Sequence, residues 1–415
     1  MSKINNLLLP YRGMPKEIYI IFLARIINAL GCFVMPLLTI IMTQSIGLSP
    51  ETSGFYISLT GLLFIPATIV GGKLADLIGR KKVIAGFNGL GIVLYLIAGS
   101  LEPTVHMVYV IMAAAAAISA AGPAHDALLA DLTVPENRSG AYSLSYMGWN
   151  MGFAVGPVMG GLLYKDHLPW VFYGDALTAL LALILIITTI KEPRTGERIK
   201  QSRKLEQYEE GSVFRVLLKR RILLYFAAIM FGYNFAYSQV SFMLPMQTIQ
   251  NFGEDGAKYF GYIAGFNGLV VLLFTPIVTR VAQRIPIIRR MVYGGLLYAL
   301  GLGMLGVLNY LVFIFIWAWV FTLGEIILAI SVTPFIINQT PASHRGRISA
   351  VIPMMFHLGN TLGPLGMGKV LTVLSLDNGW RLLGVSTLMF SMLMWRLERR
   401  EQRSENRQLT GSQQI

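Results

Sequence analysis

Apolar stretches recur along nearly the whole chain, and short polar segments separate them. Each is close to the ~20 residues that an α-helix needs to cross the hydrocarbon core of a bilayer. In the first half we expect helices over residues 18–42, 54–76, 82–100, 105–131, 139–163 and 169–190. In the second half we expect helices over residues 221–246, 258–280, 289–308, 310–336, 346–373 and 379–396. The pattern predicts an all-α polytopic membrane protein with twelve transmembrane helices.

The composition supports insertion into a bilayer. Of the 415 residues, 54% are hydrophobic and 13% are charged, and the mean hydropathy is +0.60. A soluble domain carries about 25% charged residues. This chain therefore lacks the polar surface that a soluble protein of its length needs. Its single cysteine, Cys32, excludes a disulfide framework and a cysteine-based metal site.

The charged residues alternate between the two sides of the predicted helices. Lysine and arginine gather on one side, as in Arg80-Lys81-Lys82 and residues 191–221, whereas the opposite loops hold Glu51, Glu102, Asp166, Glu254, Asp255 and Asp377. Cytoplasmic loops are enriched in lysine and arginine. The net charge of +13 therefore indicates topology rather than nucleic-acid binding. We predict a multi-pass protein of the cytoplasmic membrane with both termini in the cytoplasm.

The chain divides into two similar halves. Residues 1–190 form a predicted six-helix bundle, 191–220 a polar cytoplasmic linker, 221–397 a second bundle and 398–415 a cytoplasmic tail. An offset of 207 residues carries Gly152, Gly156, Pro157 and Gly161 onto Gly359, Gly363, Pro364 and Gly368. The same offset carries Asp131 onto Asn338 and Arg138 onto Arg345. Duplicated membrane halves predict a substrate path at their interface, opened to each side in turn by rocking of the halves.

A loop motif joins the second and third predicted helices, with the sequence Gly72-Lys-Leu-Ala-Asp76-Leu-Ile-Gly79-Arg80-Lys81-Lys82. Its glycines permit a tight turn, and its aspartate can pair with arginine or with a helix N-terminus. A basic turn alone would explain the cations but neither Asp76 nor the glycine spacing. The motif resembles the loop signature of the major facilitator superfamily. The resemblance implies the major facilitator fold and a conformational latch formed by Gly72, Asp76, Gly79, Arg80 and Lys81.

The fifth predicted helix carries Asn150, Gly152, Gly156, Pro157, Gly160 and Gly161. Small residues at this spacing let helix backbones approach closely, and proline bends a helix. Any tightly packed bundle uses glycine in this way. The Gly-Pro-x-x-Gly-Gly string nevertheless resembles the fifth-helix motif of the superfamily's drug:proton antiporters, which implies export.

Glu325 is the most informative single residue, because it lies in an otherwise apolar helix. It follows Tyr310, at the outer end, by 15 residues, or roughly 22 Å at 1.5 Å per residue. An ionised carboxylate in hydrocarbon costs at least ~2.5 kcal/mol, so Glu325 must face a cavity, pair with a cation or hold a proton. Its surroundings resemble the tenth helix of the lactococcal multidrug:proton antiporter, where the matching glutamate takes part in proton coupling. The alternative is a structural carboxylate bonded to a neighbouring helix.

Other intramembrane polar residues extend the candidate set. Asp175 and Asp126 are further candidates for proton coupling, and the equal alternatives are a solvated carboxylate at the outer interface for Asp175 and a structural partner of Arg25 for Asp126. Aromatic walls accommodate cationic ligands through cation–π contact. We place a candidate substrate cavity at Arg25, Tyr233, Asn234, Tyr237, Gln239 and His357.

The predicted function is secondary active transport, with proton-coupled efflux of amphipathic or cationic drugs by alternating access. Export of one metabolite, such as a siderophore, sugar or lipid-like compound, and proton symport remain alternatives. Helix four lacks the arginine of many drug:proton antiporters, and helix five lacks the acidic residue of the lactococcal one, which weakens the case for proton coupling. A non-transporting receptor would usually append a sensory domain, for which the linker and the tail are too short.

No metal cluster, nucleophile–base set or ATP-binding Gly-x4-Gly-Lys-Ser/Thr is present in the sequence, so we predict neither an enzyme nor a cofactor. The expected partners are a small-molecule substrate, protons and the bilayer, without nucleic acid, and we expect a monomer.

Overall fold

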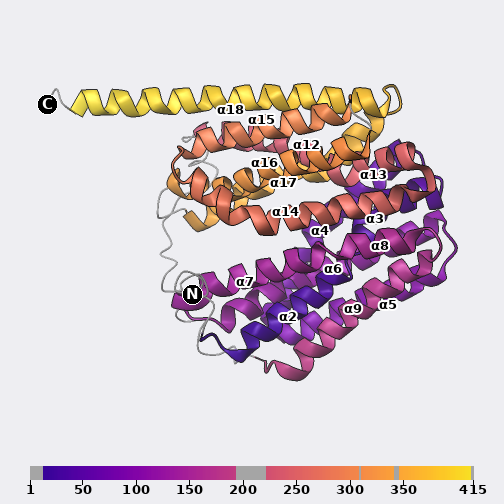
Figure 1. The fold of residues 1–415 in the computed structure, drawn as a ribbon. Helices are drawn as coiled ribbons and strands as arrows, with labels where there is room; N and C mark the ends of the chain where they lie inside the picture. The colour runs from indigo at the N-terminus through magenta and orange to yellow at the C-terminus, as the bar shows by residue number, and fades with distance from the viewer. Residues whose placement is uncertain (1–12, 193–220, 308–309, 341–344, 413–415) are drawn as a thin grey trace, which may run out of the picture. The chain divides into compact units, whose positions relative to one another are not determined.

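The computed structural model describes residues 13–192, 221–307, 310–340 and 345–412, and these are almost entirely helical (Figure 1). The helices of the first half are α2 (Lys16–Leu30), α3 (Val34–Ile40), α4 (Pro50–Ile78), α5 (Arg80–Ser100), α6 (Val105–Asp131), α7 (Pro135–Phe153), α8 (Gly156–Tyr164) and α9 (Leu168–Thr189). Those of the second half are α12 (Arg221–Tyr237), α13 (Gln239–Phe252), α14 (Gly256–Ala282), α15 (Ile287–Leu305), α16 (Leu311–Asn338), α17 (Arg345–Val370) and α18 (Leu376–Ser412). The predicted all-α class is confirmed.

Seven segments of the described chain are long and apolar enough to cross a membrane. One of them, Arg221–Ala282, has 62 residues, far more than one crossing needs. The chain therefore crosses the membrane several times, while the number of twelve crossings stays a prediction.

Three predicted helices are interrupted. The first, expected over 18–42, ends at Leu30, resumes at Val34 and finishes in a π-helical turn, Ile41–Ser45. The fifth breaks at Ala154 and Val155, directly before the Gly156-Pro157 pair that starts α8. The seventh breaks at Ser238, and the 207-residue offset carries Gly31, at the first break, onto this position. The repeat thus extends to an interruption in the first helix of each half.

The chain forms two compact units, which we call the first and second units. The first holds Met1–Lys204 and Leu244–Leu272, and the second holds Leu205–Met243 and Leu273–Ile415. The later part of α13 and the earlier part of α14 therefore group with the first unit, although they belong to the second half of the sequence. The predicted division at residues 190, 220 and 397 stays a prediction, and most of the predicted linker, from residue 193, lies outside the described residues.

The last helix is longer than expected. We predicted 379–396, but α18 continues to Ser412, through most of the predicted tail (Figure 1). Arg289 Nε of α15 donates to Glu398 Oε1 at 2.7 Å, and Gln339, after α16, donates to Glu401. These contacts, together with the good helix propensity of Glu, Arg and Gln, explain why the helix continues.

Candidate functional site

Glu325 of α16 is held by a side chain from another helix of the second unit. Its Oε1 accepts a hydrogen bond of 3.0 Å from the Tyr237 hydroxyl, at the C-terminal end of α12. Glu325 is half-buried. A hydroxyl donor stabilises a charged carboxylate, and partial exposure leaves the group reachable by a proton or a cation.

The Tyr237 side chain that bonds this carboxylate belongs to a cluster of stacked aromatic rings. The Tyr237 ring stacks on Phe321, one turn before Glu325, with centroids 6.0 Å apart. Phe321 also stacks on Tyr298 of α15 at 4.3 Å and on Trp317 at 5.4 Å. Phe321, Tyr298 and Trp317 are buried, whereas the Tyr237 ring is half-buried and lies next to the carboxylate, where its face can attract an organic cation. Tyr298 was not predicted, because no pattern along the chain indicates that α15 packs against this part of α16.

The other predicted cavity residues of the second unit have different partners. Tyr233 is 1% exposed, and its hydroxyl donates to Ser391 Oγ of α18 at 3.1 Å. Asn234 Nδ2 donates to the Met230 carbonyl oxygen, and the fully buried Gln239 donates to the carbonyl oxygen of Phe235 at 2.9 Å. His357 is exposed on α17. The structure thus brings Tyr237 to Glu325, while Tyr233, Asn234 and Gln239 bond elsewhere.

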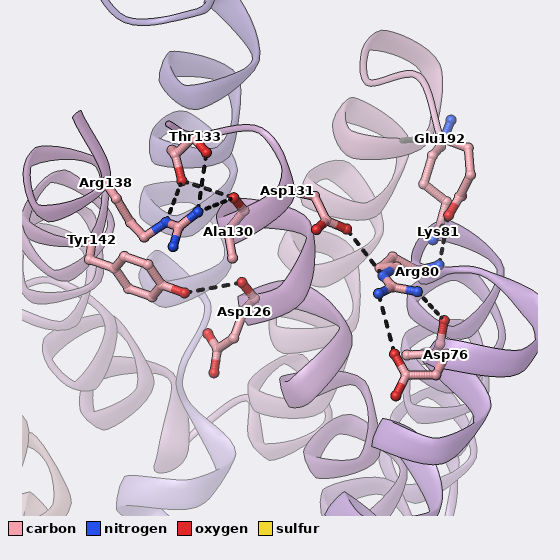
Figure 2. Close-up of polar contacts among 11 residues, drawn as sticks. Asp76, Arg80, Lys81, Asp126, Ala130, Asp131, Thr133, Arg138, Tyr142 and Glu192 are labelled. Carbon is pink, nitrogen blue, oxygen red and sulfur yellow. Dashed lines mark hydrogen bonds and ion pairs between the residues drawn. The ribbon is translucent and has the colours of Figure 1, made fainter. Parts of the chain in front are cut away.

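Two predicted acidic residues of the first unit have partners. Asp126 Oδ1 lies 3.8 Å from Arg25 Nη2, the pair expected from the sequence, and the Asp126 side chain is 66% exposed. The Tyr142 hydroxyl donates to the backbone oxygen of Asp126 (Figure 2). Asp175 Oδ2 accepts a 3.2 Å hydrogen bond from the Val34 amide, where α3 begins after the break. The half-buried Asp175 therefore satisfies an amide at the start of the resumed helix.

The loop motif forms a charged cluster around Arg80, which is 8% exposed. Its guanidinium lies 3.3 Å from Asp76 Oδ1 and 3.2 Å from Asp131 Oδ2, at the C-terminal end of α6 (Figure 2). Its Nη1 also donates to the Ala75 carbonyl oxygen at 2.9 Å. Burial of a charged guanidinium is unfavourable, and the two ion pairs and the hydrogen bond offset this cost. The cluster ties together the ends of α4, α5 and α6 at the predicted cytoplasmic side.

Glu192 completes this cluster and was not predicted. It follows α9, and its carboxylate accepts the backbone amides of Arg80 at 2.7 Å and Lys81 at 3.0 Å. Lys81 Nζ in turn donates to the Ile187 carbonyl oxygen of α9. A carboxylate on exposed amides at the start of α5 is favoured by the helix dipole. A signal existed in the sequence, because Glu192 is an acidic residue three positions after the end of an apolar helix.

The glycines of the loop motif differ in their surroundings. Gly79 has φ of 102°, a conformation that favours glycine, so the tight turn has a physical cause. A Cβ on Gly72 would lie at an ordinary 3.6 Å from Pro123. A Cβ on the neighbouring Gly71 would overlap the carbonyl oxygen of Ala120. Gly71, outside the motif, therefore makes the close contact between α4 and α6.

The different surroundings of Gly71 and Gly72 predict different stabilities for the two alanine variants. Gly71→Ala is expected to destabilise the protein by about 1–3 kcal/mol, because the added methyl group forces the two backbones apart. Gly72→Ala is the matched control and should unfold like the wild type. Thermal unfolding of the purified protein in detergent measures both, and equal midpoints for the two variants would contradict the α4–α6 contact.

The fifth-helix glycines make backbone contacts on two sides. A Cβ on Gly152 would lie 2.6 Å from the Ile26 carbonyl oxygen, and one on Gly156 would lie 2.7 Å from the Ala29 carbonyl oxygen, both on α2. A Cβ on Gly160 would lie 3.1 Å from the Phe33 Cβ atom, and one on Gly161 would overlap the Ala257 backbone of α14. Asn150 Nδ2 donates to the Tyr146 carbonyl oxygen within α7. The helix therefore packs on the first helix of its own half and on α14 of the other.

An ion pair closes the end of this α8–α14 contact. Lys165 Nζ, after α8, lies 2.8 Å from Glu254 Oε2, before α14. The hydrogen bond and charge of Lys165 lower the pKa of Glu254, and the same bond and charge of Glu254 raise the pKa of Lys165. The pair is therefore lost as the pH falls through the pKa of Glu254 or rises through that of Lys165. Exposed pairs contribute little to stability, so the glycine packing dominates this contact.

Comparisons with known proteins agree with this architecture. The profile of the family described as Major Facilitator Superfamily matches residues 21–364. The chain is 28% identical to the multidrug resistance protein MdtH of Edwardsiella ictaluri (strain 93-146) over 398 residues, 91% of this chain and 93% of that protein. It is 24% identical to a Na(+), Li(+), K(+)/H(+) antiporter of Planococcus maritimus over 368 residues, 80% of this chain and 84% of that protein.

Solved structures share the fold. The crystal structure of the peptide transporter POT in complex with sulfate matches with a TM-score of 0.74 at 18% identity, covering 94% of this chain and 96% of that one. The resemblance to the major facilitator superfamily, first noted in the loop motif, therefore holds across most of the sequence. The chain belongs to the major facilitator superfamily, and it is a membrane transporter.

Proposed function

We propose that this transporter exports amphipathic organic cations in exchange for protons. The observation that carries the proposal is the Glu325 carboxylate, bonded to Tyr237, whose ring stacks on Phe321 and Tyr298. A carboxylate can hold either a proton or a cation, and the half-buried Tyr237 ring adds cation–π attraction for a flat, positively charged compound. One site thus serves both ligands, and their competition couples them.

In this scheme, the proton and the substrate favour different access states. Protonation of Glu325 releases the cation on one side, and deprotonation prepares the site on the other. Asp126 and Asp175 are secondary candidates for proton binding, limited by their contacts with Arg25 and Val34. A membrane potential of 100 mV supplies about 2.3 kcal/mol for each charge moved.

The loop motif and the two-half organisation have roles in the same transport cycle. The Arg80 cluster is a latch whose ion pairs with Asp76 and Asp131 form in one access state and loosen in the other. Rocking of two halves divided at 191–220, with both termini and the latch on the cytoplasmic side, gives alternating access.

Exchange of inorganic cations for protons is the second candidate. It is favoured by the relative from Planococcus maritimus, which is described as a Na(+), Li(+), K(+)/H(+) antiporter. A carboxylate and a hydroxyl are suitable oxygen ligands for such ions, whereas the stacked rings would then have no role in binding.

Inverted membrane vesicles distinguish the two candidates. The vesicles are acidified inside by respiration, and a pH-sensitive dye reports proton release when ethidium or a sodium or potassium salt is added. We expect ethidium to release protons and to accumulate in vesicles that contain the transporter, and the salts to have no effect. Responses to the salts alone would favour the second candidate and overturn the first.

A further inference from the structure

An apolar groove of about 400 Å³ lies on the second unit between α15 and α18. Its walls are Leu296 and Leu300 of α15 and Val385 and Leu388 of α18, and the Leu300 and Val385 side chains are 57% and 68% exposed. The groove therefore opens toward the surroundings of the unit. In a protein that spans a membrane, an exposed apolar groove of this kind contacts lipid chains.

Two glycines form the floor of the groove. A Cβ on Gly384 would lie 2.9 Å from the Gly303 Cα atom, so the helices cross closely at this point. A Cβ on Gly303 would meet no atom within 4 Å. The space above Gly303 is thus unfilled by the side chains of the unit, and a flexible chain can lie across it.

Arg381 lies at one end of the groove, five residues after the start of α18. Its Nε donates to the Gly306 carbonyl oxygen at 2.9 Å, and its Nη1 donates to Asn378 Oδ1 at 3.2 Å. These bonds fix the guanidinium, while Nη2 has no hydrogen-bond partner among the residues that the structure describes. Asp377 forms no ion pair with Arg381 within the same residues. A fixed, exposed cation with a remaining donor suits a phosphate group.

We propose that this groove binds a phospholipid, with its phosphate on Arg381 and one acyl chain along the groove. Five residues of helix place Arg381 about 7–8 Å below the end of α18, near the depth of the headgroups. From Arg381 to Leu388 the groove runs seven residues, or about 10 Å, in the direction of an acyl chain. The site is independent of the Glu325 site and of the transported compound.

Photolabelling in lipid nanodiscs tests this assignment. The probe is phosphatidylglycerol with a diazirine in one acyl chain, and the comparison lipid is a diacylglycerol with the same chains and no phosphate. Mass spectrometry of peptides then locates the label. We expect phosphatidylglycerol to label residues 296–303 and 384–388 about tenfold more than diacylglycerol does. One charge-assisted hydrogen bond between the phosphate and Arg381 raises the affinity by about this factor.

Two variants and two controls complete the experiment. Arg381→Gln should reduce the phosphatidylglycerol labelling to the diacylglycerol level, and Gly303→Phe, which fills the floor, should remove labelling by both lipids. Arg396→Gln, at the opposite end of the membrane part of α18, and Met392→Phe, beyond the groove, should label like the wild type. Equal labelling by the two lipids in the wild type overturns the proposal, whether or not the variants fold. Unchanged labelling of folded Arg381→Gln or Gly303→Phe also overturns it.

Discussion

Glu325→Gln is expected to reduce the initial rate of uphill efflux by at least about tenfold. A reduction of this size is the effect of removing one charge-assisted contact. Glutamine keeps the size of the side chain and can still accept a hydrogen bond from Tyr237, but it can neither release a proton nor neutralise a cation. The two ligands whose competition drives exchange therefore lose their common site. The measurement is accumulation of ethidium by energised inverted vesicles, normalised to the amount of transporter.

A second readout separates coupling from folding. Adding substrate to the purified wild-type protein in weakly buffered detergent should release protons, and Glu325→Gln should release none. Glu102→Gln, which removes a carboxylate from a loop, is the matched control and should behave like the wild type. Tyr237→Phe should retain partial activity, because the ring remains while the hydroxyl is lost. Uphill efflux at the wild-type rate by Glu325→Gln would exclude this carboxylate from the coupling mechanism.

The continuous helices were predictable because a membrane imposes one dominant pattern. Residues 105–131 were expected as one helix, and α6 runs over those residues, since its ends coincide with the ends of the apolar stretch. The interruptions were not predictable from hydropathy. The break near Gly31 depends on packing, because a Cβ there would overlap the Thr178 side chain of α9, and on Asp175, which satisfies an amide exposed by the break.

The candidate sites were predictable in part for a similar reason. Glu325 was evident as an isolated charge in an apolar helix, and such a charge has few structural explanations in a membrane. Its ring partners come from α12 and α15, and tertiary packing alone decides that Tyr237 and Tyr298 meet Phe321. The Arg80 cluster was likewise predictable in its sequence motif but not in its tertiary partners. Its motif was visible, whereas its partner Glu192 lies 112 residues away from Arg80.

Crosslinking Lys165→Cys to Glu254→Cys is expected to stop transport almost completely. The side chains meet at 2.8 Å, and a Cβ on Gly265 of α14 would lie 2.6 Å from the Ala154 carbonyl oxygen, so this region has no spare space. Lys165 belongs to the first half of the sequence and Glu254 to the second. If the halves rock apart during each cycle, a short covalent link between these positions blocks the cycle.

The experiment uses a Cys32→Ala background and a short bis-methanethiosulfonate, which forms a reducible disulfide with each cysteine and releases sulfinate. Efflux of the exported compound should fall to the vesicle background on crosslinking and return after reduction, while either single cysteine should respond little. Ser45→Cys with Tyr164→Cys is the matched control, because these side chains lie 2.8 Å apart and both belong to the first half. Its crosslink should leave efflux near the wild-type rate, since that half moves as one body. Continued efflux by protein fully crosslinked between positions 165 and 254 would show that the α8–α14 contact stays closed throughout the cycle, and alternating access would then need a different moving surface.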